Sequence, residues 1–226
     1  MTELAAQLDH EAQIGPCPAG RAGLAAKRVV DVLGAGTVLM LTAPLMAVLA
    51  LLIRLDSKGP CIYRASRLGF GGKPITVFKF RSMVSDADQG VHRDYLLKLL
   101  AEDPDAGDDL YKVKDDPRIT RVGRFLRRTS LDELPQLVNV LRGEMSLVGP
   151  RPEVPYVLEA YEPWMYRRFG MPPGLTGLWQ IRGRGALPPR EMLRLDAEYV
   201  DTWSWWQDLH ILAVTPFRVF SRGSTS

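Results

Sequence analysis

One long apolar run, residues 29–53, constrains this chain more than any other feature, because its only charged side chain is that of Asp31. A helix of that length would be roughly 37 Å long at 1.5 Å per residue, which matches or exceeds the hydrocarbon core of a bilayer. The rest of the chain is ordinary soluble sequence with many arginines. We therefore expect one membrane-embedded segment joined to one water-soluble domain.

Pro44 stands in the middle of the run, where it lacks an N–H and clashes with the carbonyl group of Met40. The helix should therefore kink or break there, and Thr42 is placed to bond a freed carbonyl group, a usual repair within membranes. Basic residues flank the run on both sides: Arg21, Lys27 and Arg28 before it, and Arg54, Lys58, Arg64 and Arg67 after it. Such charges favour the cytoplasm for both ends.

A helix that enters and leaves on the same membrane face satisfies both the proline and the flanking charges. A straight single-pass helix stays open, since prolines are common in true membrane spans. A cleaved signal peptide is disfavoured, because the run is too long for the apolar region of such a peptide and residues 55–60 lack the small-residue cleavage pattern.

Composition excludes several classes of protein. Lys and Arg number 29 and Asp and Glu number 26, so the net charge of +3 is too balanced for nucleic-acid binding through bulk charge alone. With 46% apolar and 24% charged residues, the chain is globular rather than largely disordered. Cys17 and Cys61 form no CxxC pair and the three histidines are scattered, so neither a disulfide scaffold nor a zinc site is expected.

A β-hairpin is predicted after the apolar run. Residues 61–67 and 75–81 are rich in β-branched and aromatic side chains, and a segment containing Gly and Pro separates them. Alternation along the second strand places Lys79 and Arg81 on one face. This face either binds a ligand or is a solvated strand edge, and the pattern itself favours neither.

In the middle of the chain an acidic stretch is followed by a basic one. Residues 88–100 predict a helix, and residues 102–116 predict an acidic surface loop. Thr120 is then a candidate N-cap for a short helix. Three arginines share a face of that helix: Arg121, Arg124 and Arg128. Such a face suits phosphates, lipid headgroups or plain water, and the spacing alone does not choose between them.

The segment SLDELPQL, residues 130–137, places two adjacent carboxylates at a predicted helix start. Ser130 and Glu133 have the spacing of a capping box, whereas Asp132 as N-cap would put Pro135 in the first turn, where it costs little. Capping is the purely structural interpretation. Because backbone N–H groups at a helix start also hold phosphate, a carboxylate nucleophile here indicates chemistry on a phosphate ester. An exposed aspartate with an ordinary pKa is ionised at neutral pH and needs no activating base.

Arg151 stands between Pro150 and Pro152, which restrict the backbone around it. A guanidinium group fixed in this way is a preorganised donor for phosphate. A tight turn with an exposed arginine is the structural alternative.

The end of the chain, residues 203–220, predicts a mostly apolar helix interrupted at Pro216. Three of the five tryptophans lie there: Trp203, Trp205 and Trp206. This density suits a membrane–water interface, with a core helix as the alternative.

Several motifs occur in the order of a known family: KFRSM at residues 79–83, DPRIT at 116–120, SLDELPQL at 130–137, the segment 145–152, and GLTG at 174–177. With them the chain resembles the bacterial sugar transferase family, the monotopic phosphoglycosyl transferases that start glycan assembly on undecaprenyl phosphate. The resemblance covers about residues 27–218 and implies a minimal form, limited to the catalytic core. One departure is Ala43 before Pro44, where the family often has serine.

The resemblance implies an α+β fold with a re-entrant membrane helix, a small mixed domain with a β-hairpin, and amphipathic interfacial helices. It divides the chain into a cytoplasmic lead (residues 1–26), a re-entrant helix broken near Pro44 (27–56) and a catalytic domain (57–226). The C-terminal helix of that domain would lie in the interface, on the cytoplasmic face of the inner membrane.

The resemblance also implies Mg²⁺-dependent chemistry in two steps. An aspartate attacks the β-phosphate of a UDP-sugar, releases UMP and holds the sugar phosphate covalently until undecaprenyl phosphate takes it. That nucleophile maps to Asp132, with Glu133 as Mg²⁺ ligand or acid/base partner. The implied phosphate contacts are Lys79, Arg81, Arg118 and Arg151, with Gln136 supporting the site.

Two alternatives stay open beside this reading. One is a non-enzymatic, membrane-anchored basic module that binds anionic lipid or nucleic acid, which gives no reason for the carboxylate pair. The other is the same reaction by direct displacement, with Asp132 holding the metal. The expected partners are a UDP-sugar, undecaprenyl phosphate and membrane lipid, and nucleic acid is not expected. The sequence leaves open whether the protein forms a homo-oligomer and which sugar it transfers.

Overall fold

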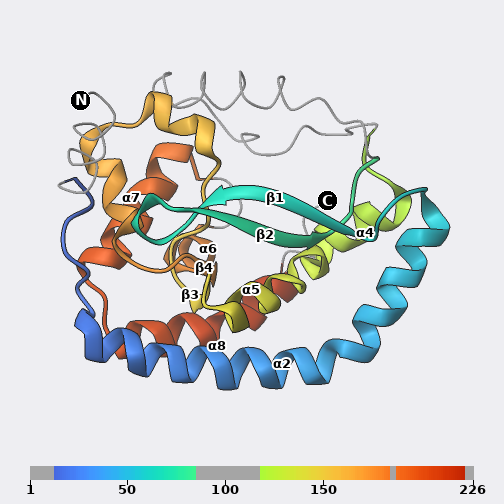
Figure 1. The fold of residues 1–226 in the computed structure, drawn as a ribbon, viewed down its shortest axis with the longest axis horizontal. Coiled ribbons are helices and arrows are strands. Elements are labelled where there is room, and N and C mark those ends of the chain that lie inside the picture. The colour runs from blue at the N-terminus through green and yellow to red at the C-terminus, as the bar shows by residue number, and fades with distance from the viewer. Residues whose placement is uncertain (1–12, 85–117, 184–186, 222–226) are drawn as a thin grey trace.

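The computed structural model describes residues 13–84, 118–183 and 187–221 of the chain. These residues combine helices with two small two-stranded sheets (Figure 1), which confirms the mixed α+β class. The helix predicted at residues 88–100 and the acidic loop predicted at residues 102–116 lie outside the described residues.

Helix α2 (Gly20–Asp56) contains the whole apolar run and starts inside the segment 1–26 that we assigned to an N-terminal lead. Among the described residues it is the one helix long and apolar enough to cross a membrane. Only 11% of its most apolar window is buried, so it differs from the core helix of a soluble protein. Its exposed large apolar side chains include Val29, Leu33, Met40, Leu41, Val48, Leu51 and Leu55.

We predicted a kink or a break at Pro44, and the break is wrong, because Pro44 lies inside α2, which is one continuous helix. Figure 1 shows that α2 instead bends along its course, with its second part turning toward α4. The Thr42 hydroxyl donates to the carbonyl oxygen of Val38 at 2.7 Å, rather than to that of Met40, which loses its helical donor at Pro44. The repair predicted for Thr42 is therefore wrong. A threonine bonded to the carbonyl group four residues earlier bends a helix, which adds to the effect of the proline.

Buried polar contacts attach the first half of α2 to the rest of the molecule. The Lys27 ammonium lies 2.6 Å from a carboxylate oxygen of Asp208, and both side chains are buried. Asp31 accepts hydrogen bonds from the Ser146 hydroxyl at 2.9 Å and from the backbone N–H of Leu147 at 2.8 Å. Since buried polar groups are costly without partners, these contacts hold α2 in one position against the soluble domain.

Strands β1 (Ile62–Leu68) and β2 (Pro74–Phe80) pair antiparallel and confirm the predicted hairpin. The connection contains Gly71 at φ 66°, a left-handed conformation that favours glycine. Lys79 stands directly opposite Tyr63 in the register, so both side chains lie on the same face of the hairpin.

A second, parallel sheet forms from β3 (Ser146–Val148) and β4 (Gly174–Thr176). The connection between them carries two 3-10 segments, η3 (Pro155–Ala160) and η4 (Pro163–Gly170). Three helices follow: α6 (Leu178–Arg182), α7 (Pro189–Asp201) and α8 (Trp205–Ser221). The main core joins α2, β3, α7 and α8, and its fully buried members include Ala35, Val148, Tyr199, Val200 and Ile211.

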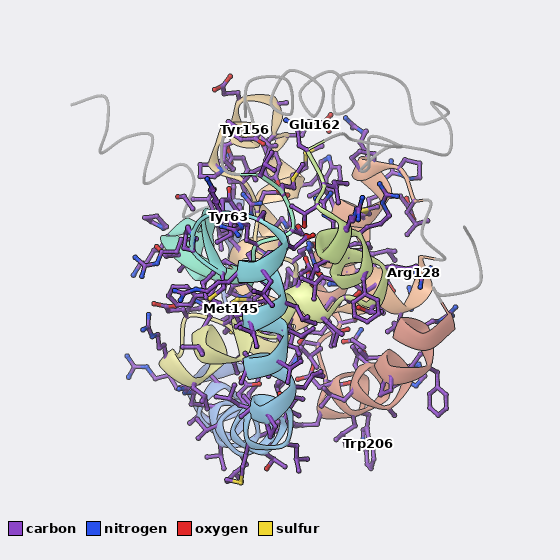
Figure 2. All side chains as sticks on the ribbon, turned by 90° about the vertical axis from the view of Figure 1, so that its right-hand side faces the viewer. Tyr63, Arg128, Met145, Tyr156, Glu162 and Trp206 are labelled. Atoms are coloured by element: carbon purple, nitrogen blue, oxygen red, sulfur yellow. The ribbon has the colours of Figure 1, made fainter. Side chains whose placement is uncertain are left out.

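Helix α8 continues through Pro216, so the interruption predicted there is wrong. Ile211 is fully buried, whereas Trp206 and Phe217 are 80% and 76% exposed. Figure 2 shows Trp206 at the lower edge of the molecule, directed outward. The helix therefore packs on the core with one side and exposes large apolar side chains on another.

Helix α4 (Arg121–Thr129) begins after Thr120, whose hydroxyl oxygen accepts a hydrogen bond from the N–H of Gly123 at 2.9 Å. The predicted N-cap is thus confirmed, and the three arginines predicted to share a face, Arg121, Arg124 and Arg128, are all exposed. Helix α5 (Gln136–Arg142) follows after a short turn. That turn carries the two adjacent carboxylates.

Candidate active site

Asp132 and Glu133 lie in η2 (Leu131–Glu133), a single 3-10 turn between α4 and α5. Ser130 precedes it at φ 57° and is, among the described residues, the only non-glycine residue with a positive φ. Ser130 is the C-cap of α4 and precedes η2 without a side-chain capping hydrogen bond, and the N-cap position of α5 is Pro135, so the predicted capping of a helix start by Ser130 or Asp132 is wrong. The left-handed residue and the 3-10 hydrogen bonds turn the chain before α5 can start, which presents both carboxylates on a tight turn.

Three segments far apart in the sequence meet at Glu133. The Lys79 ammonium of β2 lies 3.0 Å from Glu133 Oε1. Arg151 Nη2 lies 2.5 Å from the same oxygen, and Arg151 Nη1 lies 3.4 Å from Oε2. The structure therefore brings together three of the residues predicted for the site, two cations around one carboxylate.

The charged side chains of this cluster shift one another's pKa values. Burial alone would raise the pKa of Glu133, but the charges and hydrogen bonds of Arg151 and Lys79 together hold that pKa well below its usual range. Burial lowers the pKa of Lys79, and the charge of Glu133 opposes this effect. The charge of Glu133 also raises the pKa of Arg151. At neutral pH the glutamate is therefore ionised and held between two cations.

Asp132 differs from its neighbour in its contacts. The described part of the chain supplies no hydrogen-bond donor to its carboxylate, although Lys79, Arg151 and Arg127 are close enough to affect its charge. Burial and the negative charge of Glu133 raise its pKa above the usual value, against those three cations. The expectation of an ordinary, exposed aspartate is therefore wrong. Its oxygens remain available to an incoming phosphorus atom or cation.

Backbone packing holds the loop that presents Arg151. The Gly149 N–H donates to the carbonyl oxygen of Thr176 at 2.9 Å, and the Gly174 N–H donates to that of Pro150 at 2.7 Å. A Cβ atom at Gly149 would lie 2.2 Å from the carbonyl oxygen of Pro172, so only glycine fits this approach. The segments 145–152 and 174–177 are thus packed against each other.

Arg168 is a buried residue that the sequence analysis missed. Its guanidinium donates to the Arg151 carbonyl oxygen at 2.7 Å and to a carboxylate oxygen of Asp196 at 2.6 Å. It also contacts Glu153 and donates to the Tyr161 hydroxyl at 2.8 Å. Burial raises the pKa of Asp196 to about 7, against the opposing charge of Arg168. Nothing in the local sequence separates Arg168 from its neighbour Arg167.

Arg81 serves a different purpose from the predicted phosphate contact. Its guanidinium is buried and donates to the carbonyl oxygens of Ile53, Ser57 and Lys58 at the end of α2, and to the Ser57 hydroxyl. The Ile53 carbonyl group also accepts from the N–H of Ser57, whereas Ser57 and Lys58 lie past the end of the helix, so the arginine holds the C-terminus of α2. Strand β2 ends at Phe80, so the alternation that predicted a shared face with Lys79 stops before Arg81.

Arg118 and Gln136 lie on either side of the carboxylate turn in the sequence. The Arg118 carbonyl oxygen accepts from the N–H of Val84 at 2.9 Å, just before α4, and a phosphate contact for its side chain stays a prediction. Gln136 is the first residue of α5 and is buried, and its amide Nε2 has no partner among the described residues. Its supporting role stays a prediction too.

Comparison with known proteins places this geometry in context. The chain is 44% identical over 199 residues to an undecaprenyl-phosphate galactose phosphotransferase of Salmonella typhimurium, covering 87% of this chain and 40% of the relative. It is 43% identical over 192 residues to a UDP-galactose-lipid carrier transferase of Erwinia amylovora, covering 84% and 39%. It is 40% identical over 203 residues to the exopolysaccharide production protein ExoY of Rhizobium meliloti, covering 88% of each.

The chain thus spans about two fifths of the length of the first two relatives but most of the third. The bacterial sugar transferase family matches residues 22–222, which include α2, the hairpin, the carboxylate turn and the Arg151 loop. With a match over nearly the whole chain, the protein belongs to the bacterial sugar transferase family.

Proposed function

We propose that this protein transfers a sugar 1-phosphate from a UDP-sugar to undecaprenyl phosphate and releases UMP. This would be the first membrane step in the biosynthesis of a bacterial glycan, such as an exopolysaccharide, a capsule or an O-antigen. The observation that carries the proposal is the cluster in which Lys79 and Arg151 hold Glu133 next to Asp132. The names of relatives, a galactose phosphotransferase and a lipid carrier transferase among them, support the reaction class.

The residues fit a covalent route with balanced bonds. A carboxylate oxygen of Asp132 attacks the β-phosphorus, the bond from that phosphorus to the bridging oxygen breaks, and UMP leaves with the electron pair. A phosphate oxygen of undecaprenyl phosphate then attacks the same phosphorus, and Asp132 leaves as a carboxylate. Lys79 and Arg151 would neutralise charge on the phosphoryl oxygens in both steps, which is the main requirement of phosphoryl transfer.

Glu133 acts in this proposal as the group that positions both cations. Without a buried counter-charge, the cations would repel each other and Lys79 would lose its proton more readily. An incoming diphosphate then meets a cationic pair already fixed in place. Direct displacement at phosphorus, without the aspartyl intermediate, is the alternative that the mass experiment below separates.

Magnesium at the carboxylate pair is part of the proposal. Within the described ranges no group of three or more His, Cys, Asp or Glu side chains is arranged to hold a metal. In the covalent route an ion would therefore be held by Glu133 together with waters and substrate phosphate oxygens, and Mg²⁺ commonly uses so few protein ligands. Glu133 would have to share oxygens already bonded to Arg151 and Lys79, whereas an ion on Asp132 belongs to the direct-displacement alternative. Bound there, the ion would neutralise charge on the diphosphate.

We also propose that α2 is re-entrant and that the soluble domain lies on the cytoplasmic face of the inner membrane. The bend in α2, Pro44 within it and basic residues at both of its ends support this arrangement. The exposed side chains Trp206 and Phe217 of α8 suit the membrane interface.

The function is tested by UMP release. Purified protein in nanodiscs would be mixed with UDP-glucose, UDP-galactose or UDP-N-acetylglucosamine, with and without undecaprenyl phosphate. We expect sustained UMP release with at least one UDP-sugar, dependent on the lipid acceptor and on Mg²⁺. Failure of every UDP-sugar, together with tight binding to anionic vesicles, would instead support the non-enzymatic basic module.

A further inference from the structure

A groove of about 590 Å³ lies between β1 and η3. Its lining residues are Tyr63, Arg64, Ala65, Ser66, Arg67, Pro155 and Tyr156. Small-molecule sites usually have volumes of about 300–1,000 Å³. We propose that this groove binds the nucleotide part of the UDP-sugar, an inference that rests on the function proposed above.

Both walls of the groove lead to the carboxylate cluster. On one wall, Tyr63 stands opposite Lys79 and shares its face of the hairpin. On the other, the chain runs from Arg151 into η3, and the backbone of Glu153 pairs with that of Leu68 at the end of β1, with N–H to O distances of 2.7 and 3.2 Å. The groove is therefore built from segments that adjoin the strand and the loop carrying the two cations that contact Glu133.

Arg67 adds a cation to the groove, close enough to Arg151 for the two charges to affect each other. Burial lowers the pKa of its guanidinium, and the positive charge of Arg151 lowers it further, against the opposing charge of Glu153. An anion between them would relieve this repulsion. A diphosphate carries two phosphate groups in a row, which matches one group at Lys79 and Arg151 and the next at Arg67.

The two tyrosines that line the groove suit a base. Tyr63 and Tyr156 lie on the same side of the molecule (Figure 2), and Tyr63 is 46% exposed. Aromatic rings of this kind stack on nucleobases. Within the described residues β1 pairs along one side with β2, and its other edge is bridged at Leu68 to Glu153. The remaining edge offers backbone N–H and C=O groups to the acceptor–donor–acceptor edge of uracil.

Charge argues against the other two parts of the reaction as occupants. Undecaprenyl phosphate carries an anion too, but its polyprenyl chain is apolar and gains nothing from the two arginines that line the groove, Arg64 and Arg67. A hexose is uncharged and places no anion at Arg67. The nucleotide alone combines a flat base, a ribose with hydroxyl groups and an anion.

Equilibrium binding of UMP to the full-length protein in nanodiscs tests the groove without turnover. Tyr63→Ala should weaken UMP binding about tenfold, the size expected when one base loses an aromatic partner. Arg67→Gln should weaken UMP binding by a similar factor but leave uridine binding nearly unchanged. Tyr156→Phe, which keeps the ring, should stay close to wild type.

Two control variants match the test variants in chemistry. Phe70→Ala removes an exposed aromatic ring from the same hairpin outside the groove, and Arg194→Gln removes an exposed arginine from α7. Both should leave the affinity for UMP unchanged. Glucose 1-phosphate serves as the competing probe, because it carries a sugar and a phosphate but no base.

Steady-state kinetics separate this inference from the function itself. We expect Tyr63→Ala and Arg67→Gln to raise KM for the UDP-sugar about tenfold with little change in KM for undecaprenyl phosphate. If wild type releases UMP but both variants keep wild-type UMP affinity, the groove is not the nucleotide site. Selective loss of glucose 1-phosphate binding, or a changed KM for the lipid, would also overturn it. If wild type releases no UMP from any UDP-sugar, the proposed function fails, and the UMP affinities still decide the groove.

Discussion

Glu133 meets Arg151 through both of its carboxylate oxygens, with Nη2 2.5 Å from Oε1 and Nη1 3.4 Å from Oε2. A two-point contact fixes the plane of the guanidinium as well as its distance, which a lysine in the same place would not achieve. Lys79 contacts the same Oε1 from the hairpin. Glu133 thus joins two segments of the chain at one point, beside the carboxylate of Asp132.

Asp132→Asn should lower the rate of UMP release on the order of 10⁴-fold, as the loss of other covalent nucleophiles does. The amide keeps the shape but not the charge. Intact-protein mass after mixing with a UDP-sugar and no lipid acceptor should show one added sugar phosphate on wild type and none on the variant. Asp201→Asn, a change at an exposed carboxylate of α7, is the control and should behave as wild type. Full activity of Asp132→Asn, or turnover of wild type without an adduct, would end the covalent mechanism.

The acid limb of the pH–rate profile should report Asp132. Its pKa is raised, so activity should be lost as the pH falls through a value above that of an ordinary aspartate, because the nucleophile becomes protonated. The charge of Arg127 lowers this pKa, so Arg127→Gln should move the acid limb to higher pH. Arg128→Gln, at the exposed neighbouring position, should leave the limb in place. Equal shifts in both variants would show that the limb reports net charge instead.

Glu133→Gln should move the alkaline limb to lower pH. The charge of Glu133 raises the pKa of Lys79 against the effect of burial, so its removal lets the lysine lose its proton earlier. Adduct formation in a single turnover, followed by mass against pH, gives this measurement even when steady turnover is weak. An unchanged alkaline limb would show that Lys79 does not have to be protonated. Glu191→Gln on α7 is the matched control.

Arg168→Gln should destabilise the fold by about 3–5 kcal/mol, because it leaves the buried Asp196 without its cation. The folded Asp196 carboxyl holds a proton that the unfolded chain releases above about pH 4, so stability falls as the pH rises toward the folded pKa of about 7. In Arg168→Gln the pKa of Asp196 rises further, so the stability of the fold keeps falling as the pH rises above that value. The loss of Tm should therefore be larger at pH 8.5 than at pH 6.

Arg182→Gln is the comparison for that loss, since Arg182 pairs with Glu198 and both side chains are exposed. It should change Tm much less and without the same pH dependence. Equal losses of Tm in the two variants would show that the Arg168 cluster contributes no more to stability than an ion pair on the surface. The double change Arg168→Gln with Asp196→Asn should recover part of the stability.

Both ends of α2 should be cytoplasmic. Single cysteines at Ala22 and Pro60, both exposed positions, would be introduced after replacing Cys17 and Cys61 by alanine. A membrane-impermeant thiol reagent added to intact cells should label neither position, and both should react after lysis. Labelling at residue 22 alone in intact cells would establish a single-pass helix. Pro44→Ala should increase that labelling, because a straighter helix favours spanning.

Local features of this molecule follow from short stretches of sequence. The hairpin, the N-cap at Thr120 and the long apolar helix each depend on neighbouring residues: alternation in the strands, a hydroxyl before α4, and a run without charges. The local prediction that was wrong at the carboxylate turn failed because neighbouring residues favour different backbone conformations. Ser130 adopts a left-handed conformation, so the carboxylates lie on a 3-10 turn rather than at a helix start.

The candidate site itself was decided by the tertiary structure. Lys79 and Arg81 lie in the same motif and have the same sign, yet one contacts Glu133 and the other satisfies the end of α2, because strand β2 ends between them. Arg167 and Arg168 are adjacent, yet burial is imposed on Arg168 by the packing of η4 against α7. Short-range patterns specify backbone conformation, whereas the partner of a long charged side chain depends on which distant segment packs beside it. For that reason the sequence by itself determined which residues form the motifs of the site. The fold alone determined which of those residues form ion pairs with one another.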